Sequence, residues 1–273
     1  MAKKAATKPE LPAVQESPGT AIATTEPSRF EVLKPDSEIA QALAANLNGE
    51  KLTVSDLTIV KTPSGGNTNW TIEELSGEVT TDSITGLLVY YAPHGVLWPL
   101  ADPSGDSKPL LVTDNLITAR KVGDDYGDLD PKVIEAYRND DGTYDWLNLP
   151  YNQFGTGKGG FGKRCKEQRI MCILREQDHF PLLIRVAPGS LRNVTPFVKK
   201  LPVEHWRAIV ELKLEKAKSS SNQDFSKIKP RLAGTISREH GAIINATYTK
   251  AIGAAAQEGA LSGADDSGGD DLE

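Results

Sequence analysis

The chain has 273 residues, of which 38% are hydrophobic, and a formal net charge of −6 at pH 7. This length and hydrophobic fraction are enough for one large or two small globular domains. The apolar runs are far shorter than the roughly 20 residues that cross a bilayer. No apolar segment follows the N-terminal lysines, which argues against a secretory signal and favours a cytoplasmic location. Cys165 and Cys172 stand seven positions apart, a spacing typical of neither zinc sites nor disulfide frameworks.

The first half of the chain contains weak helix signals and clear strand signals. Residues 1–29 are rich in Ala, Thr, Pro, Glu and Ser without periodicity, so we expect a disordered N-terminal segment. Asp36 or Ser37 can cap a short helix that stops at 48–49. Residues 52–98 combine β-branched and aromatic residues with Gly and Pro, which predicts strands, including a hairpin pair at 86–92 and 95–98.

The later elements alternate between short apolar strands and capped helices. An acidic stretch at about 101–145 is predicted to be an insertion with one helix, which begins at Asp130-Pro131. Further strands are expected at 169–175, 180–186, 208–216 and 229–236, and helices at 190–201, with Ser190 as its cap, and 237–257. The pattern predicts an α+β fold of mainly antiparallel strands. We expect an OB-like small barrel over residues 30–258, with helical and acidic insertions between disordered tails.

Charge is strongly segregated along the chain. Residues 151–250 contain 19 Lys/Arg against 8 Asp/Glu, whereas the other positions contain 12 against 29. Such clustering is unfavourable unless the basic segment meets a polyanion, which indicates nucleic acid. After Lys250 there is no Lys or Arg, and the end of the chain, 259–273, is small, flexible and acidic. We interpret this end as a tail that competes with nucleic acid or recruits a partner protein, through Asp265, Asp266, Asp270, Asp271 and Glu273.

The densest motif is a Gly-rich stretch at 149–166. Residues 157–163 satisfy the letters G-x-x-x-x-G-K of a nucleotide-binding loop, but Arg164 replaces the magnesium-binding Ser or Thr and a strand, not a helix, is expected to follow. Cations interleaved with aromatic residues instead suit single-stranded DNA, whose bases stack on rings. The alternative is a solvated loop whose aromatics belong to the core. The expected contacts are Tyr151, Phe154, Lys158, Phe161, Lys163, Arg164, Lys166 and Arg169, with Trp206, Lys213, Lys216, Lys227, Lys229 and Arg231 in support.

Three segments resemble a family of phage-encoded single-stranded DNA-binding or recombination-associated proteins. They are 150–157 (PYNQFGTG), 162–166 (GKRCK) and 181–191 (PLLIRVAPGSL). The resemblance covers roughly 75–238 and implies an OB-like binder of single strands. Trp146 and Leu149 occupy the positions of two paired cysteines in that family, so Cys165 has no thiolate partners and we predict no zinc site.

The sequence gives little support for catalysis or metal binding. The four histidines are scattered without metal-ligand spacing, and the carboxylates of the acidic insertion do not follow a calcium-loop order. We therefore predict a non-enzymatic protein without cofactor that supports phage DNA replication or recombination. A virion structural or assembly protein that uses the basic face for protein contacts is the alternative, and a metal-dependent nuclease using the acidic insertion is a third.

Overall fold

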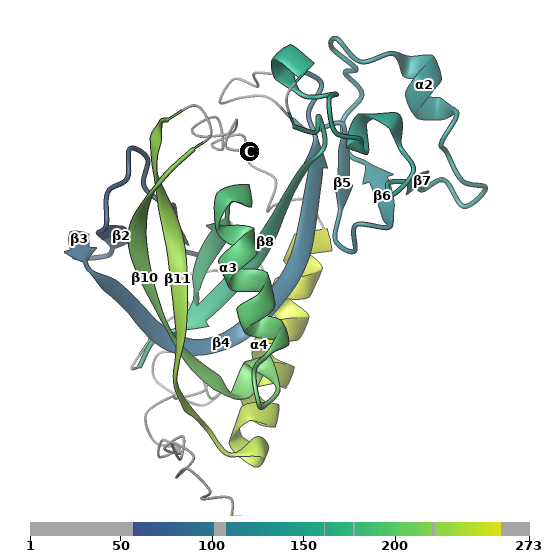
Figure 1. The fold of residues 1–273 in the computed structure, drawn as a ribbon. Helices are drawn as coiled ribbons and strands as arrows, with labels where there is room; N and C mark the ends of the chain where they lie inside the picture. The colour runs from purple at the N-terminus through teal and green to yellow at the C-terminus, as the bar shows by residue number, and fades with distance from the viewer. Residues whose placement is uncertain (1–56, 101–107, 161, 177, 220–221, 258–273) are drawn as a thin grey trace, which may run out of the picture.

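Figure 1 shows the computed structural model of the chain, which describes residues 57–100, 108–160, 162–176, 178–219 and 222–257. Several predictions fall outside these residues. They concern the disordered segment at 1–29, the helix after Ser37, the side chain of Phe161 and the acidic tail at 259–273.

The long strand β4 (Ser83–Leu97) is the centre of the main sheet. One edge of β4 pairs with β8 (Lys166–Leu174). The other edge pairs first with β10 (Ala208–Lys218) and then with β5 (Leu111–Thr113). Beyond β8 lie β9 (Leu182–Val186) and the two-residue β1 (Ile59–Val60), and beyond β10 lies β11 (Asp224–Thr235). All these pairs are antiparallel except β1 with β9.

One helix packs on each face of this sheet. Met171 and Ile173 of β8 lie in the apolar cluster that α3 (Pro188–Lys199) covers. The alternate residues of β8 lie in the cluster under α4 (Arg238–Gln257). A strand that is buried on both faces has no polar alternation, which explains why β8 is a continuous apolar run in the sequence. Figure 1 shows α3 within the curve of the sheet and α4 along β4.

The acidic insertion folds around its own apolar cluster. The short strands β6 (Thr118–Lys121) and β7 (Tyr144–Asp145) continue the sheet from β5. The helix α2 (Pro131–Glu135) begins where we expected, because the Asp130 carboxylate accepts a hydrogen bond from the Lys132 N–H at 2.9 Å. Trp146 is completely buried in this cluster. A separate hairpin, β2 (Trp70–Glu74) with β3 (Gly77–Thr81), is anchored by the Trp70 indole, which donates to the Leu212 carbonyl.

The α+β class with a mainly antiparallel sheet is confirmed, but the described strands form no closed barrel. The strand β1 has only two residues, and an isolated bridge between Ser64 and Phe225 is the contact that brings its end of the sheet toward β11. The interior that a small barrel would close is occupied by α3. Among the described helices, none is long and apolar enough to span a membrane.

Three local predictions were wrong. Residues 86–97 belong to one strand and not to a hairpin, because Pro93 and Gly95 remain paired with β8. The helix α3 begins at Pro188, and the Ser190 hydroxyl accepts a hydrogen bond from the Ile228 N–H of β11 instead of capping it. The strand β11 begins at Asp224 and contains Pro230, which an edge strand tolerates.

Candidate nucleic-acid interface

The Gly-rich loop is a closed turn between the 3₁₀ turn η3 (Pro150–Asn152) and β8. The N–H groups of Gly155 and Gly157 both point to the Gly162 carbonyl, at 2.7 and 3.3 Å. Gly155 and Gly162 have φ values of 89° and 59°, which favour glycine over residues with a Cβ. Because these two N–H groups are used inside the loop, they do not contribute to a phosphate-binding nest.

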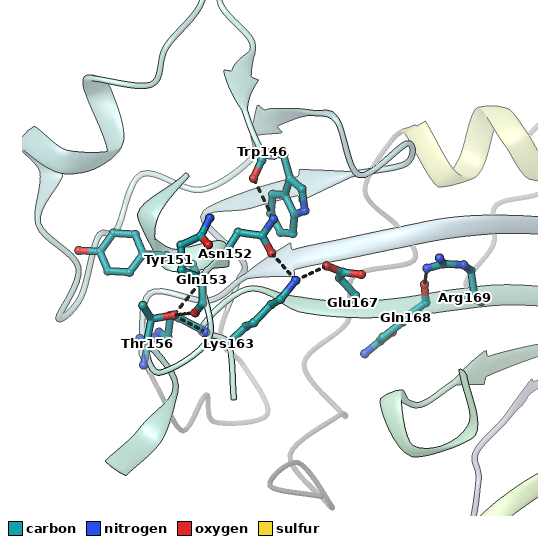
Figure 2. A network of polar contacts seen from close by, with 10 residues as sticks. Trp146, Tyr151, Asn152, Gln153, Thr156, Lys163, Glu167, Gln168 and Arg169 are labelled. Atoms are coloured by element: carbon teal, nitrogen blue, oxygen red, sulfur yellow. Dashed lines mark hydrogen bonds and ion pairs between the residues drawn. The ribbon is translucent and has the colours of Figure 1, made fainter. Parts of the chain in front are cut away.

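An exposed aromatic ring stands beside a cation on this loop. The side chain of Phe154 is 68% exposed, and the Lys163 ammonium lies 5.4 Å from its ring centroid. Figure 2 shows the same ammonium between Asn152 and Glu167, at 3.4 and 3.0 Å from their oxygens. Asn152 is itself held by donation from its amide to the Trp146 carbonyl. The ring and the charge are thus fixed next to each other, an arrangement that suits a base stacked beside its phosphate.

Arg164 does not belong to the exposed cations, and its expected role as a phosphate contact is corrected. The residue is 7% exposed. Its guanidinium donates to the carbonyls of Trp98 and Pro99 at 3.3 and 3.0 Å and to the Asp128 carboxylate. Because a buried guanidinium must be paired, this side chain is committed to joining the basic loop to the acidic insertion.

Two of the predicted stacking residues pack against the protein. The Tyr151 hydroxyl accepts a hydrogen bond from the Asp130 N–H at 2.9 Å, and its ring packs beside the apolar cluster of the insertion. The Trp206 ring lies so close to α4 that a Cβ on Gly241 would approach it to 2.8 Å. Phe154 is therefore the best placed of the described aromatic candidates for stacking.

Four of the second group of predicted cations lie on the outer face of the β10–β11 hairpin, namely Lys213, Lys227, Lys229 and Arg231. By strand register, Arg231 faces Glu211, Lys229 faces Lys213 and Lys227 faces Glu215. Arg231 is 2.7 Å from a Glu211 oxygen, whereas Lys229 is 3.7 Å from Glu215 and Lys213 is 3.9 Å from Glu211. Lys216 pairs with Asp224 near the turn of the hairpin. Cross-strand acids thus neutralise part of this face.

The start of β8 and the turn of the hairpin lie at the same end of the molecule, the upper end in Figure 1. Lys166 and Arg169 stand near the start of β8, where strand alternation places them on opposite faces of the sheet. Lys158 lies on the turn η4 (Lys158–Gly160) of the Gly-rich loop. The described candidates therefore fall into a loop group and a hairpin group, with Trp206 outside both.

Three further ionisable residues, Glu135, Cys165 and Cys172, are committed to structure. Glu135 accepts hydrogen bonds from Tyr126 and Tyr144, and these together with Lys121 hold its pKa below the usual range. Burial raises the pKa of the thiols of Cys165 and Cys172. In the parts of the chain that the structure describes, no group of three or more His, Cys, Asp or Glu residues could hold a metal ion.

Sequence reasoning missed the two contacts that organise the loop. Arg164 and Asp128 are 36 positions apart, and no spacing rule links them. The buried amide of Asn152 is visible in sequence only as a polar residue between aromatics. No protein-family model, no curated protein and no solved structure matches the chain.

Proposed function

We propose that the protein binds single-stranded DNA without strong sequence preference and serves phage DNA replication or recombination in the host cytoplasm. The observation that carries the proposal is Phe154, an exposed ring with the Lys163 ammonium fixed beside it. Stacking is sequence-tolerant because every base has a π face, and the adjacent cation attracts the backbone phosphate. The protein performs no catalysis in this role.

The proposed path of the strand follows the upper end of the molecule in Figure 1. Bases stack on Phe154, while phosphates meet Lys158, Lys163, Lys166 and Arg169 and continue toward the hairpin cations. In this proposal, the curved sheet with its extended hairpin serves as the platform that an OB-like barrel provides in other binders of single strands. The resemblance of the 150–157 and 162–166 segments to phage single-stranded DNA-binding proteins supports the same function.

The acidic end of the chain completes the proposal as a competitor for the same cations. Asp265, Asp266, Asp270, Asp271 and Glu273 follow a Gly- and Ser-containing segment, and a tethered polyanion reaches a high effective concentration at a basic surface. When DNA displaces this segment, it becomes available to a basic site on a replication or recombination protein.

A protein-contact role in virion assembly is the second candidate, and one observation favours it. Ile117 and Leu147 are 60% and 57% exposed, and they are adjacent because the Leu147 N–H donates to the Ile117 carbonyl. Exposed apolar side chains of this kind are typical of protein interfaces when they form a contiguous patch. Under this alternative, Phe154 belongs to the same protein-binding surface.

Titration of a fluorescently labelled oligonucleotide, with Phe154→Ala and the matched control Leu147→Ala, separates the two functions. We expect Phe154→Ala to weaken binding by about 1–3 kcal/mol because a stacked base is lost. Leu147→Ala should bind as the unchanged protein, and both variants should melt at nearly its temperature because both side chains are exposed. Equal affinities for the two variants would contradict the proposal.

Salt dependence provides a second test with the unchanged protein. If about five phosphates are contacted, the logarithm of affinity should fall against the logarithm of salt concentration with a slope of about −3.5, since each contact contributes about −0.7. Duplex DNA of equal length should bind more weakly because its stacked bases are not available to Phe154. An affinity that does not change with salt would exclude the electrostatic part of the interface.

A further inference from the structure

A further cluster of basic side chains, separate from the loop group and the hairpin group, lies on the sheet face that carries α4. It lies beyond the apolar cluster under this helix. His94 of β4 is paired in register with Gln168 of β8, two positions before Ile170, which packs under α4. Arg185 of β9 is paired with Ile170 itself. Because side chains alternate between faces along a strand and registered partners share a face, His94 and Arg185 both point to the α4 side.

The strands on the other edge of β4 add one more cation to this group. Val112 of β5 is opposite Val96, and Arg120 of β6 is opposite Val112. Val96 follows His94 by two positions, so Arg120 shares its face. The group of His94, Arg120 and Arg185 thus comes from three different strands, and no short sequence motif contains it.

Two buried polar atoms in this group have no hydrogen-bond partner. His94 is 3% exposed, and its Nε2 atom is unpaired. The Nε atom of Arg185 is also buried and unpaired, although the residue makes another interaction. A buried polar atom without a partner is destabilising, and a ligand that completes its hydrogen bonding removes this penalty. Gln168, 7% exposed, adds a third polar side chain beside His94.

The electrostatic environment of His94 favours an anion. Its pKa is lowered to about 4, first by burial and then by the charges of Arg185 and Arg120. The imidazole is therefore neutral at pH 7 and donates through one ring nitrogen, while the two guanidiniums supply positive charge. Asp114, just after β5, is an acidic residue near this face, but it is exposed to solvent.

We propose that His94, Arg120 and Arg185 form a binding site for an oxyanion, separate from the DNA interface proposed above. The guanidinium groups of Arg120 and Arg185 and the His94 Nε2–H donate hydrogen bonds to the oxygens of the anion. Such an oxyanion is either a phosphate group from outside the chain or a carboxylate of the chain's own acidic segment at 265–273. The two sources share this chemistry, and a variant without the tail carboxylates distinguishes them.

The first arm of the test is a titration of the full-length, isotope-labelled protein with inorganic phosphate, at constant ionic strength, observed through the His94 imidazole by NMR. His94→Gln identifies its signal among those of the four histidines. We expect a saturable shift of the Nε2 resonance and a rise of the His94 pKa, because the bound anion stabilises the charged imidazole. This measurement on the unchanged protein does not depend on whether a variant folds.

Variants then assign the guanidiniums. Arg185→Gln and Arg120→Gln should each weaken phosphate binding at least about tenfold, since each removes a charge-assisted hydrogen bond. Arg238→Gln is the matched control, because this residue pairs with Glu204 at the other end of α4. It should bind phosphate as the unchanged protein does. An equal loss in all three variants would overturn the site.

The second arm distinguishes the sources. In a full-length variant, Asp265, Asp266, Asp270 and Asp271 become Asn and Glu273 becomes Gln. If the chain's own carboxylates occupy the site, the His94 signal changes in this variant without added phosphate, and phosphate then binds more tightly. If phosphate shifts His94 equally in both proteins, the ligand comes from outside the chain. A His94 signal that responds to neither change overturns the proposal, while DNA binding can still be measured independently.

Discussion

The Gly-rich loop and the β10–β11 hairpin are similarly basic in sequence, but their cations are used differently. In the loop, Arg164 is buried between two carbonyls and a carboxylate, and Lys163 is fixed beside Phe154. On the hairpin, Arg231 is 67% exposed, and its partner Glu211 lies directly across the strands. A dense cluster of cations therefore contains both charges that serve the structure and charges that are available to a ligand. The burial of each side chain distinguishes the two kinds.

The largest expected effect is on stability. Arg164→Ala should lower the free energy of unfolding by about 2 kcal/mol, because it removes a buried guanidinium that donates to the Trp98 and Pro99 carbonyls and to the Asp128 carboxylate. Arg231→Ala should change stability little, because its ion pair is exposed to solvent. Chemical denaturation of both variants measures the difference. Similar losses for the two would mean that the loop and hairpin cations do not differ in the way described.

The next prediction concerns DNA binding by each region. Replacing Lys158, Lys163 and Lys166 together by Ala should weaken binding at least tenfold and make the salt slope about 2 units less steep, from about 0.7 for each lost contact. The same change at Lys213, Lys227 and Lys229 should have a smaller effect because phosphates bound there lack the base stacking that the exposed Phe154 ring provides in the loop. Lys199 and Lys200→Ala, at the end of α3, is the control.

Removal of the acidic tail should have a smaller effect of opposite sign. A chain that ends after Gly259 should bind single-stranded DNA about 1 kcal/mol more tightly at low salt, because several screened ion pairs no longer compete with DNA. The gain should decrease as salt rises and the Debye length falls to about 8–10 Å. If the two chains bind equally at low salt, the tail does not compete with DNA.

The smallest expected effect comes from the hairpin acids. Glu211→Gln with Glu215→Gln keeps the shape of the face but releases Lys213, Lys229 and Arg231 from their partners. Binding should tighten by less than about threefold, as expected for exposed charges. Glu239→Gln in the first turn of α4 should leave affinity unchanged. Weaker binding in the double variant would show that the ion pairs position these cations for DNA.

The parts of the fold with regular periodicity could be predicted from the sequence, and the strand that bends through the molecule could not. The alternating residues of β10 specify its two faces, and the uniform apolar run of β8 indicates a strand that is buried on both, so both strands could be predicted. The turn signals at Pro93 and Gly95 predicted a hairpin, but pairing with β8 continues through both residues. Tertiary pairing therefore overrides a local turn preference. Predicting one continuous strand here requires knowledge of its pairing with β8, some 75 positions away.

Prediction of the candidate site had a similar limit. The Gly-rich loop was located because its composition is unusual, but composition does not distinguish Phe154 from Tyr151 or Lys163 from Arg164. These distinctions depend on the Asp130 N–H and the Asp128 carboxylate, which belong to the acidic insertion. His94 was treated as an ordinary histidine because Arg120 and Arg185 lie on other strands. Contacts between distant segments thus decide which residues are available.

The length of β4 has a consequence for how the protein unfolds. Its side chains enter the cluster under α4 at Leu87, the cluster under α3 at Leu88 and the cluster of the insertion at Leu97. Because this one strand contributes side chains to three apolar clusters, no cluster can open without disturbing strand pairs that the other two clusters need. The amides of β4 should therefore exchange with solvent only through global unfolding, and the molecule should unfold as one cooperative unit despite its separate cores.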